Sequence, residues 1–181
     1  AFTPFNITAL SSRDGYSVLE CWQLASIPVD AMQAANYAVG NTTAAAWSRI
    51  EPRTHIGEAW APHVQLSIIL NGLIRITSPA PDNGNSDPKT VVNDSSMTSS
   101  VVDDQLPETV AQAPSRPETH MAYIMPGTTK SSVLIAADLK SVSTIAGHYT
   151  EFPSDEPTIL VQIPFSGDKA PDHVILYDGP C

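Results

Sequence analysis

Basic residues, cysteines and long apolar runs are all scarce in this chain of 181 residues. Only 9 lysines and arginines stand against 19 acidic residues, which gives a formal net charge of −10. Without a basic stripe, nucleic acid and anionic membrane surfaces are poor partners. No run of about 18 apolar residues occurs, so no membrane-spanning helix is predicted. The G-x-S-x-G, H-E-x-x-H, P-loop and dinucleotide-binding motifs are missing too, and the sequence gives no support to the chemistries that depend on them.

The cysteines and the start of the sequence point to the secretory route. Cys21 and Cys181 are the only cysteines, and we predict one disulfide between them, with two free thiols as the alternative. The sequence begins at Ala1 without a methionine. We interpret it as a mature chain whose signal peptide has been removed, although a trimmed chain would look the same.

Three N-x-[S/T] sequons predict glycosylation at Asn6, Asn41 and Asn93. Together with the predicted disulfide, they indicate a secreted or extracellular glycoprotein, or one of the secretory-pathway lumen.

Short β-rich segments separated by proline and glycine turns predict an all-β fold. One short helix is expected over residues 28–35, with Asp30 as its N-cap. Asn71-Gly72 lies between two β-rich runs, which predicts a hairpin there. Residues 78–119 are rich in proline, serine, asparagine and aspartate, so we expect a long polar surface insertion.

Three stretches resemble the cupin superfamily and together cover roughly residues 53–165. They are the run 62–76, which ends in a leucine-x-glycine turn, the weaker match 123–127, and the run 138–161, in which Gly147-His148 precedes an acidic turn. The overall look is similar to small secreted fungal cupin-like proteins. The resemblance implies a single cupin-type (jelly-roll) β-barrel formed by residues 53–181, with residues 1–52 packed on it as an N-terminal wrapping segment, one domain in all.

The residues of the first cupin-like stretch determine what metal chemistry is expected. Counted back from Gly72, Gln65 falls where the family has its metal-binding glutamate, and Trp60 and Pro62 fall where it has two histidines. On this register Gln65 and Ser67 point into the barrel, and His63 lies nearer its mouth. We therefore expect no metal cofactor. The alternative is one divalent transition metal held by His63, His148, Gln65 and His55.

The remaining candidates are polar or aromatic residues in or beside the predicted strands. We assign His148 and Gln65 as catalytic, the first as general acid or base and the second to orient a carbonyl. A satisfied structural histidine, and glutamines bonded to each other or to backbone, are the alternatives. Glu151 is expected at the surface or rim. The expected ligand-binding residues are His63, Gln162, Trp60, Ser67 and Thr150.

Three functions stay open on this evidence. The first is an enzyme that acts on a small apolar or aromatic metabolite by isomerisation, cyclisation or a lyase step, as in natural-product tailoring. The second is a metal-dependent oxygenase or isomerase. The third is a non-catalytic secreted protein that binds a small molecule. A homodimer is compatible with each of them.

Overall fold

The computed structural model of the chain describes residues 3–82 and 114–181, and in these ranges the fold is all-β. Residues 1–81 and 116–181 form one compact unit, which is the subject here, and residues 82–115 are assigned to a second unit. No α-helix occurs among the described residues, which contain one short 3-10 turn, η1 (Ser166–Asp168). The strands are β1 (Asn6–Arg13), β2 (Tyr16–Leu24), β3 (Val29–Ala31), β4 (Ala34–Asn36), β5 (Ala46–Ile50), β6 (Thr54–Ala59), β7 (Gln65–Asn71), β8 (Ile74–Ser78), β9 (His120–Ile124), β10 (Val133–Ala136), β11 (His148–Phe152), β12 (Thr158–Pro164) and β13 (His173–Asp178).

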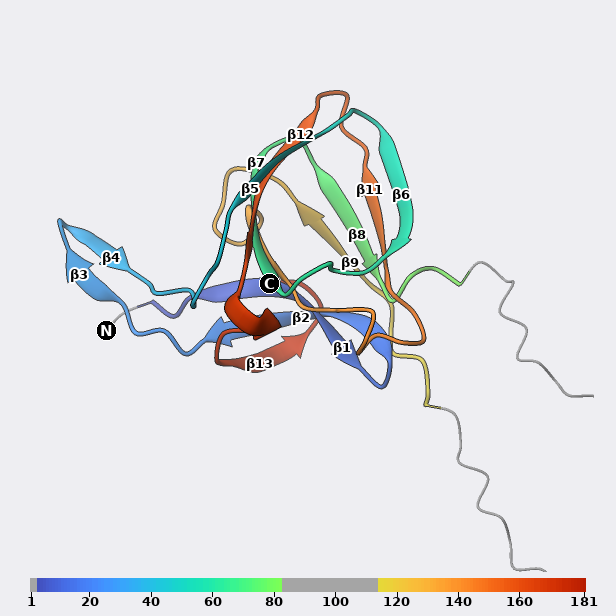
Figure 1. The fold of residues 1–181 in the computed structure, drawn as a ribbon, viewed down its shortest axis with the longest axis horizontal. Helices are drawn as coiled ribbons and strands as arrows, with labels where there is room; N and C mark the ends of the chain where they lie inside the picture. The colour runs from blue at the N-terminus through green and yellow to red at the C-terminus, as the bar shows by residue number, and fades with distance from the viewer. Residues whose placement is uncertain (1–2, 83–113) are drawn as a thin grey trace, which may run out of the picture. The chain divides into compact units, whose positions relative to one another are not determined.

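Two sheets carry most of these strands (Figure 1). The larger has seven strands in the order β13-β2-β1-β10-β7-β12-β5, and the smaller has four in the order β6-β11-β8-β9. Most neighbours are antiparallel, but β1 and β10 are parallel, with Thr8 opposite Leu134. Neither sheet closes on itself, so the structure shows an all-β fold with two open sheets.

The main hydrophobic core lies between the two sheets. Leu10, Leu19 and Ile69 enter it from the larger sheet, and Ile76 and Ile124 enter it from the smaller one. Apolar residues that alternate along each strand place one side of it in this core, as expected for sheets packed face to face. A second cluster, which includes Ile7, Trp22 and Leu66, covers the opposite face of the larger sheet. The larger sheet is therefore buried on parts of both faces.

The predicted Asn71-Gly72 hairpin is wrong. β7 belongs to the larger sheet, between β10 and β12, whereas β8 belongs to the smaller sheet, between β11 and β9. The turn carries the chain from one sheet to the other. Gly72 has a φ of +81°, and a Cβ there would lie 2.7 Å from the Thr158 Cα of β12. Asn71 Nδ2 donates to the Pro157 carbonyl at 2.8 Å, so both turn residues are held by the segment around the start of β12 rather than by β8.

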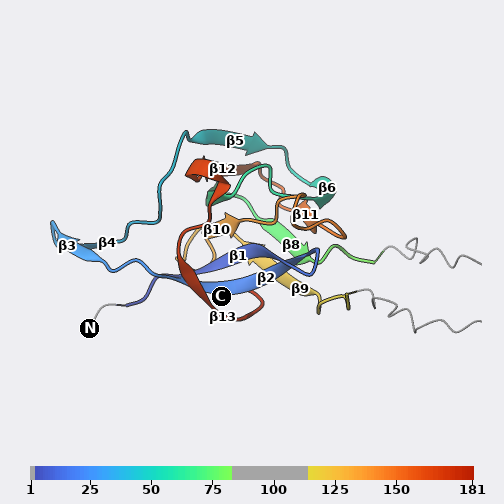
Figure 2. The ribbon, with the colours of Figure 1, turned by 60° about the horizontal axis from the view of Figure 1, so that its bottom comes forward.

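The predicted helix over residues 28–35 is also wrong, because this segment forms the hairpin of β3 and β4. The hairpin projects away from the two main sheets (Figures 1 and 2). Its turn residues, Met32 and Gln33, both have positive φ. Asn36 Nδ2 donates to the carbonyl oxygens of Val29 and Ala34 at 3.1 and 3.0 Å.

Residues from the N-terminal segment are part of the larger sheet. β1 and β2 lie inside it, and β5 is its edge strand. The two ends of the predicted insertion, residues 78–119, come close together, since Arg116 donates to the Ala80 carbonyl. Ala80 N in turn donates to Gly147 O at 2.8 Å. Residues 83–113 of the insertion lie outside the described part of the chain.

The Cys21–Cys181 disulfide is present and joins β2 to the segment after β13 across a sequence separation of 160 residues. A disulfide is compatible with a secreted or extracellular protein. Among the described residues, no helix is both long and apolar enough to cross a membrane.

Candidate functional site

Polar residues are buried on the inner face of the larger sheet, the face that looks toward the smaller sheet. Gln65 and Ser67 are 5% and 4% exposed. Together with the core residue Ile69 they occupy every second position of β7, so all three side chains point to this face. Leu66 belongs to the cluster on the opposite face. The inward orientation predicted for Gln65 and Ser67 therefore agrees with their burial.

Gln162 extends this polar strip onto the next strand. It lies opposite Ser67 in the β7–β12 ladder and shares a face of β12 with the core residue Leu160. Ser48 Oγ of β5 donates to Gln162 Oε1 at 3.3 Å. Three of the predicted site residues, Gln65, Ser67 and Gln162, are thus neighbours on two adjacent strands.

The smaller sheet contributes His148 and Thr150, which are 7% and 8% exposed and lie two positions apart on β11. His148 Nδ1 lies 2.6 Å from Asp138 Oδ2, and Ser17 Oγ of β2 donates to the same oxygen at 2.5 Å. Ser17 lies two positions before the core residue Leu19 on β2, so it faces the smaller sheet. The hydrogen-bonded group of Ser17, Asp138 and His148 therefore links the two sheets.

Asp138 is the centre of this group and is fully buried. Its other oxygen accepts a hydrogen bond from the Ala61 backbone N–H at 3.3 Å. A buried carboxylate needs such donors, because burial of an unpaired charge is costly. A carboxylate bonded to Nδ1 also fixes the orientation of the imidazole ring and leaves Nε2 as its second functional atom. No hydrogen bond to His148 Nε2 is formed within residues 3–82 and 114–181, and the side chain is 10% exposed.

This arrangement allows acid–base chemistry more readily than nucleophilic catalysis by serine. The Ser17 hydroxyl donates to Asp138, so His148 does not activate it as a base would in a Ser-His-Asp triad. His148 Nε2 is the atom that can take or give a proton.

The chain entering β11 is fixed around Trp60. The Trp60 indole N–H donates to the Ser143 carbonyl at 2.8 Å, and the Lys140 ammonium lies 4.4 Å from the ring centroid. A Cβ at Gly147 would lie 2.2 Å from the Ala59 carbonyl oxygen and 2.8 Å from the Trp60 ring. Glycine is therefore required immediately before His148, and Trp60 packs beside the site.

The other two predicted histidines lie apart from this group. His63 Nδ1 is 3.2 Å from Asp168, and its side chain is 58% exposed. His55 Nδ1 is 3.0 Å from Glu151, and its side chain is 62% exposed. His55, His63 and His148 thus each engage a different carboxylate.

The residues present do not fit the metal site that the cupin resemblance implies. No group of three or more histidine, cysteine or carboxylate side chains placed to hold a metal ion occurs among the described residues. Divalent transition metals need ligands that converge on one point. We therefore assign no chemical step to a metal.

The prediction that Glu151 lies at the surface or rim is wrong, because its side chain is buried. Its carboxylate accepts hydrogen bonds from Arg75, and these raise the pKa of the Arg75 guanidinium above its usual value. Arg75, Glu151 and His55 join the neighbouring strands β8, β11 and β6. This group supports the smaller sheet.

Sequence reasoning missed Asp138 and Ser17 as partners of His148. Asp138 directly follows the apolar run 133–137, and an aspartate at the end of a buried strand is a signal that could have found it. Ser17 carried no such signal, since a serine in a strand is commonplace.

Two of the three sequons lie in the described residues. Asn6 is at the start of β1, and its Oδ1 is buried without a hydrogen-bond partner among those residues. Asn41 is exposed. Asn93 lies outside the described residues.

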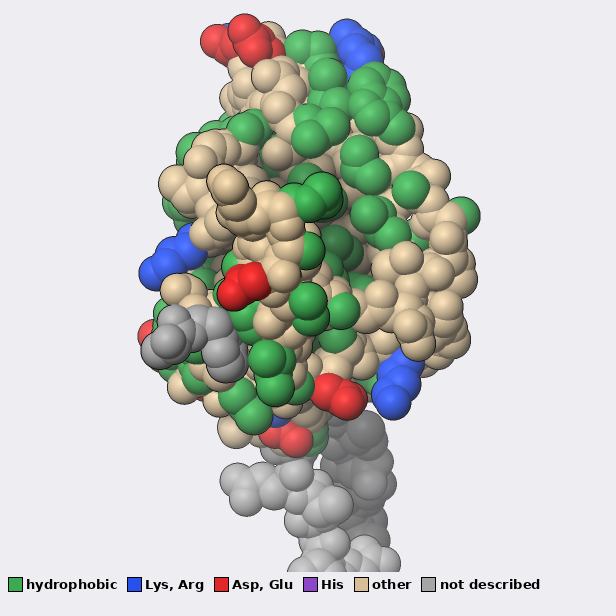
Figure 3. Space-filling model, turned by 90° about the vertical axis from the view of Figure 1, so that its left-hand side faces the viewer, with side chains coloured by type: hydrophobic (Ala, Val, Ile, Leu, Met, Phe, Trp, Pro, Cys, Tyr) green, Lys and Arg blue, Asp and Glu red, His purple; other side chains and the backbone are tan. Residues whose placement is uncertain are grey.

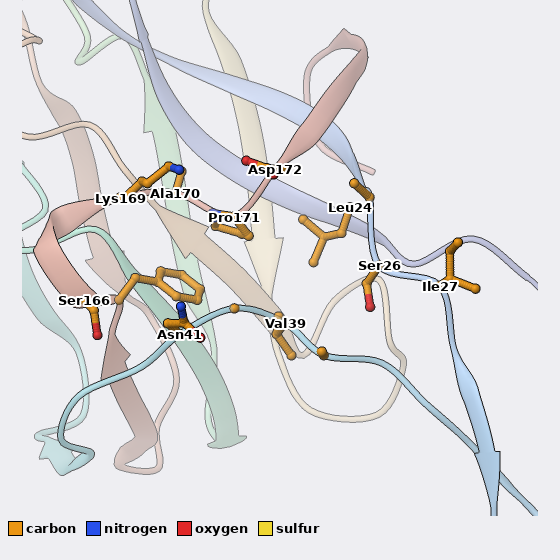
Figure 4. Close-up of a pocket in the computed structure, with 14 residues that line it drawn as sticks. Leu24, Ser26, Ile27, Val39, Asn41, Ser166, Lys169, Ala170, Pro171 and Asp172 are labelled. Atoms are coloured by element: carbon orange, nitrogen blue, oxygen red, sulfur yellow. The ribbon is translucent and has the colours of Figure 1, made fainter.

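A separate groove of about 490 Å³ lies beside the second hydrophobic cluster, the one that includes Trp22, between the ends of β2 and β4 and the segment around η1 (Figure 4). Leu24, Val39 and Pro171 lie around it, and Asn41, Lys169 and Asp172 add polar groups to its lining. None of the predicted catalytic or ligand-binding residues lines this groove.

Comparisons with protein-family models, with curated proteins and with solved structures each give no match. The functional argument therefore depends on the site itself.

Proposed function

We propose that this protein is a cupin-like enzyme that binds a small apolar or aromatic molecule at His148 and moves a proton on it with the imidazole of that residue. The observation that carries the proposal is the buried pair of Asp138 and His148, with Nε2 left without a partner among the described residues. Asp138 holds the imidazole in one orientation. His148 Nε2 then acts as general base and afterwards as general acid.

The polar strip on the facing sheet supplies the second part of the proposal. Gln65 and Ser67 are buried, and Gln162 adjoins them. Amide and hydroxyl donors of this kind orient a carbonyl and stabilise the negative charge that develops on its oxygen when a neighbouring C–H loses its proton. Apolar residues around the strip favour an apolar or aromatic substrate body. Proton transfer next to a carbonyl is a step shared by isomerases, cyclases and lyases.

The same geometry favours one second candidate, a non-catalytic small-molecule binding protein. Asp138 bonds to Ser17 of the larger sheet and to His148 of the smaller one, so this group also ties the sheets together. In that case His148 would have a structural role, and its ring would not touch a reacting atom.

Proton exchange on an aryl ketone distinguishes the two candidates. Solvent deuterium incorporation next to the carbonyl of acetophenone and its ring-substituted relatives is followed by proton NMR, and binding is measured separately by saturation-transfer NMR. The wild type should accelerate exchange over buffer, and His148→Gln should lose about 10²- to 10⁴-fold of that acceleration while ketone binding persists. The matched control is His63→Gln, because His63 also pairs with an aspartate but lies outside the Asp138 group.

Each other outcome has a definite meaning. Binding without exchange in the wild type would favour the non-catalytic protein. Equal loss of exchange in His148→Gln and His63→Gln would contradict the assignment of His148. Absence of both binding and exchange across the series would refute the proposed substrate class.

A further inference from the structure

The groove at the base of the β3–β4 hairpin has a glycosylation sequon in its lining. Asn41 lines this groove of about 490 Å³ and is exposed, and Thr43 completes the sequon Asn41-Thr42-Thr43. The Asn41 side-chain amide forms no hydrogen bond with the described part of the chain. Its Nδ2 is therefore free to carry a sugar, and that sugar starts at the groove rather than on open surface.

The backbone around Asn41 is held against the end of β12 and the start of η1. Ser166 N donates to the Asn41 carbonyl at 2.9 Å, and Thr43 N donates to the Pro164 carbonyl at 3.0 Å. Asn41 lies between Ser166 and Val39 beside the groove (Figure 4). The attachment point is thus fixed on both sides, so a sugar that packs into the groove does not have to order the chain that carries it.

The lining of the groove suits a neutral molecule that has both apolar and hydroxyl surfaces. Leu24, Val39 and Pro171 give the groove an apolar body (Figure 4). Lys169 and Asp172 add one donor and one acceptor, and neither side chain is bonded within residues 3–82 and 114–181. Their opposite charges leave no net charge to attract an ion. A sugar has apolar C–H faces, and its hydroxyls donate to a carboxylate and accept from an ammonium, so carbohydrate matches this lining.

The size of the groove and its surroundings agree with this occupant. Its volume of about 490 Å³ lies in the range of roughly 300–1,000 Å³ that is usual for small-molecule pockets. Both ends of the β3–β4 hairpin lead into the lining, through Ile27 on one side and Ala38 on the other. Hydrophobic side chains are exposed over much of the surface on the side from which this hairpin projects (Figure 3). A glycan at Asn41 covers apolar surface of this kind with a solubilising chain.

We propose that Asn41 carries an N-glycan whose first N-acetylglucosamine packs into this groove, against Leu24 and Pro171, with its polar groups bonded to Lys169 and Asp172. A sequon by itself specifies only the attachment, not where the sugar lies. The covalent link keeps the sugar at a high effective concentration beside the groove, so contacts that are weak for a free sugar suffice. This inference is independent of the proposed catalytic role of His148, since the predicted catalytic residues do not line the groove.

Enzymatic release of the glycan from the folded protein is the test. Full-length protein is secreted from eukaryotic cells, and peptide N-glycosidase acts on it in heavy-oxygen water, which marks Asn41 as it becomes aspartate. Glycopeptide mass spectrometry gives the occupancy and the release rate at Asn41, relative to the same protein after denaturation. Lys169→Ala with Asp172→Ala should speed release at least about tenfold, because each lost hydrogen bond contributes several-fold. The matched control is Lys130→Ala, at an exposed lysine outside the groove, which should leave the rate unchanged.

Thermal unfolding gives a second readout that does not depend on the enzyme. Asn41→Gln, which removes the glycan, should lower the unfolding midpoint, and this loss should shrink when Lys169→Ala and Asp172→Ala are already present. Circular dichroism confirms that each variant folds. An Asn41 that carries no glycan would overturn the proposal. So would a release rate that ignores the paired substitution at Lys169 and Asp172, or losses of midpoint that simply add, because a glycan that extends into solvent has no contact with these side chains.

Discussion

Gly72→Ala should destabilise the fold more than Gly57→Ala, although both glycines have the same φ of +81°. At Gly57 of β6, an added Cβ would meet only the Tyr149 ring, at 3.9 Å, which is ordinary contact. At Gly72 it would lie 2.7 Å from the Thr158 Cα and 2.5 Å from Thr158 Oγ1. The hydroxyl can rotate away, but the backbone of β12 cannot, because Thr158 is fully buried and β12 pairs with β7 and β5.

The magnitudes follow from two separate effects. A non-glycine residue in left-handed backbone costs about 1–2 kcal/mol, and both variants share this cost. Overpacking against β12 adds about 1–3 kcal/mol at position 72 alone. The free energy of unfolding is measured by urea titration with tryptophan fluorescence and far-ultraviolet circular dichroism. If the two variants lose the same free energy, the close approach of the β7–β8 turn to β12 is refuted.

The disulfide and the Arg13 ion pairs give two further predictions. Cys21→Ser with Cys181→Ser should lower the urea unfolding free energy by up to about 5 kcal/mol, because the bridge closes a loop of 160 residues in the unfolded chain; a loss near zero would show that the bridge does not restrict the unfolded state. Arg13 holds the pKa of Asp178 below its usual value, mainly through a side-chain hydrogen bond. The stability from this pair is therefore present above about pH 4, the unfolded pKa of aspartate, and is lost as the pH falls through the lower folded pKa. Asp178→Asn should reduce the fall in urea midpoint below pH 4, and an unchanged acid profile would contradict the assignment.

The face that a strand buries was easier to predict from the sequence than the strands with which it pairs. Side chains along a strand alternate between its two faces, so Gln65, Ser67 and Ile69 must point to the same face of β7. This pattern identified the inward face of the strand. The sequence of a turn, in contrast, does not specify which strands flank it in a sheet. Asn71-Gly72 has the composition of a hairpin, yet β10 and β12 occupy both edges of β7 and leave none for β8.

Helix propensity gave a wrong prediction for the segment that forms β3 and β4. Residues 31–35 contain three alanines, which favour a helix, but the segment forms an exposed hairpin. At the candidate site, His148 was a candidate because it lies in a cupin-like stretch, while its partners Asp138 and Ser17 come from a loop and a distant strand. A single sequence does not show that Ser17 and His148, which lie far apart in the chain, meet at the carboxylate of Asp138.

The parallel pairing of β1 with β10 has a consequence for synthesis of the chain. Thr8 lies beside Leu134, so the inner neighbour of β1 emerges from the ribosome 126 residues after it. At about 5–20 residues per second, that is a delay of roughly 6–25 s. During this interval β1 and β2 present apolar residues on both faces, since Leu10 and Leu19 belong to one core cluster and Ile7 and Trp22 to the other. During this interval the nascent chain therefore carries a two-sided apolar hairpin without the neighbour that pairs with β1, and its open strand edge is exposed to non-native pairing.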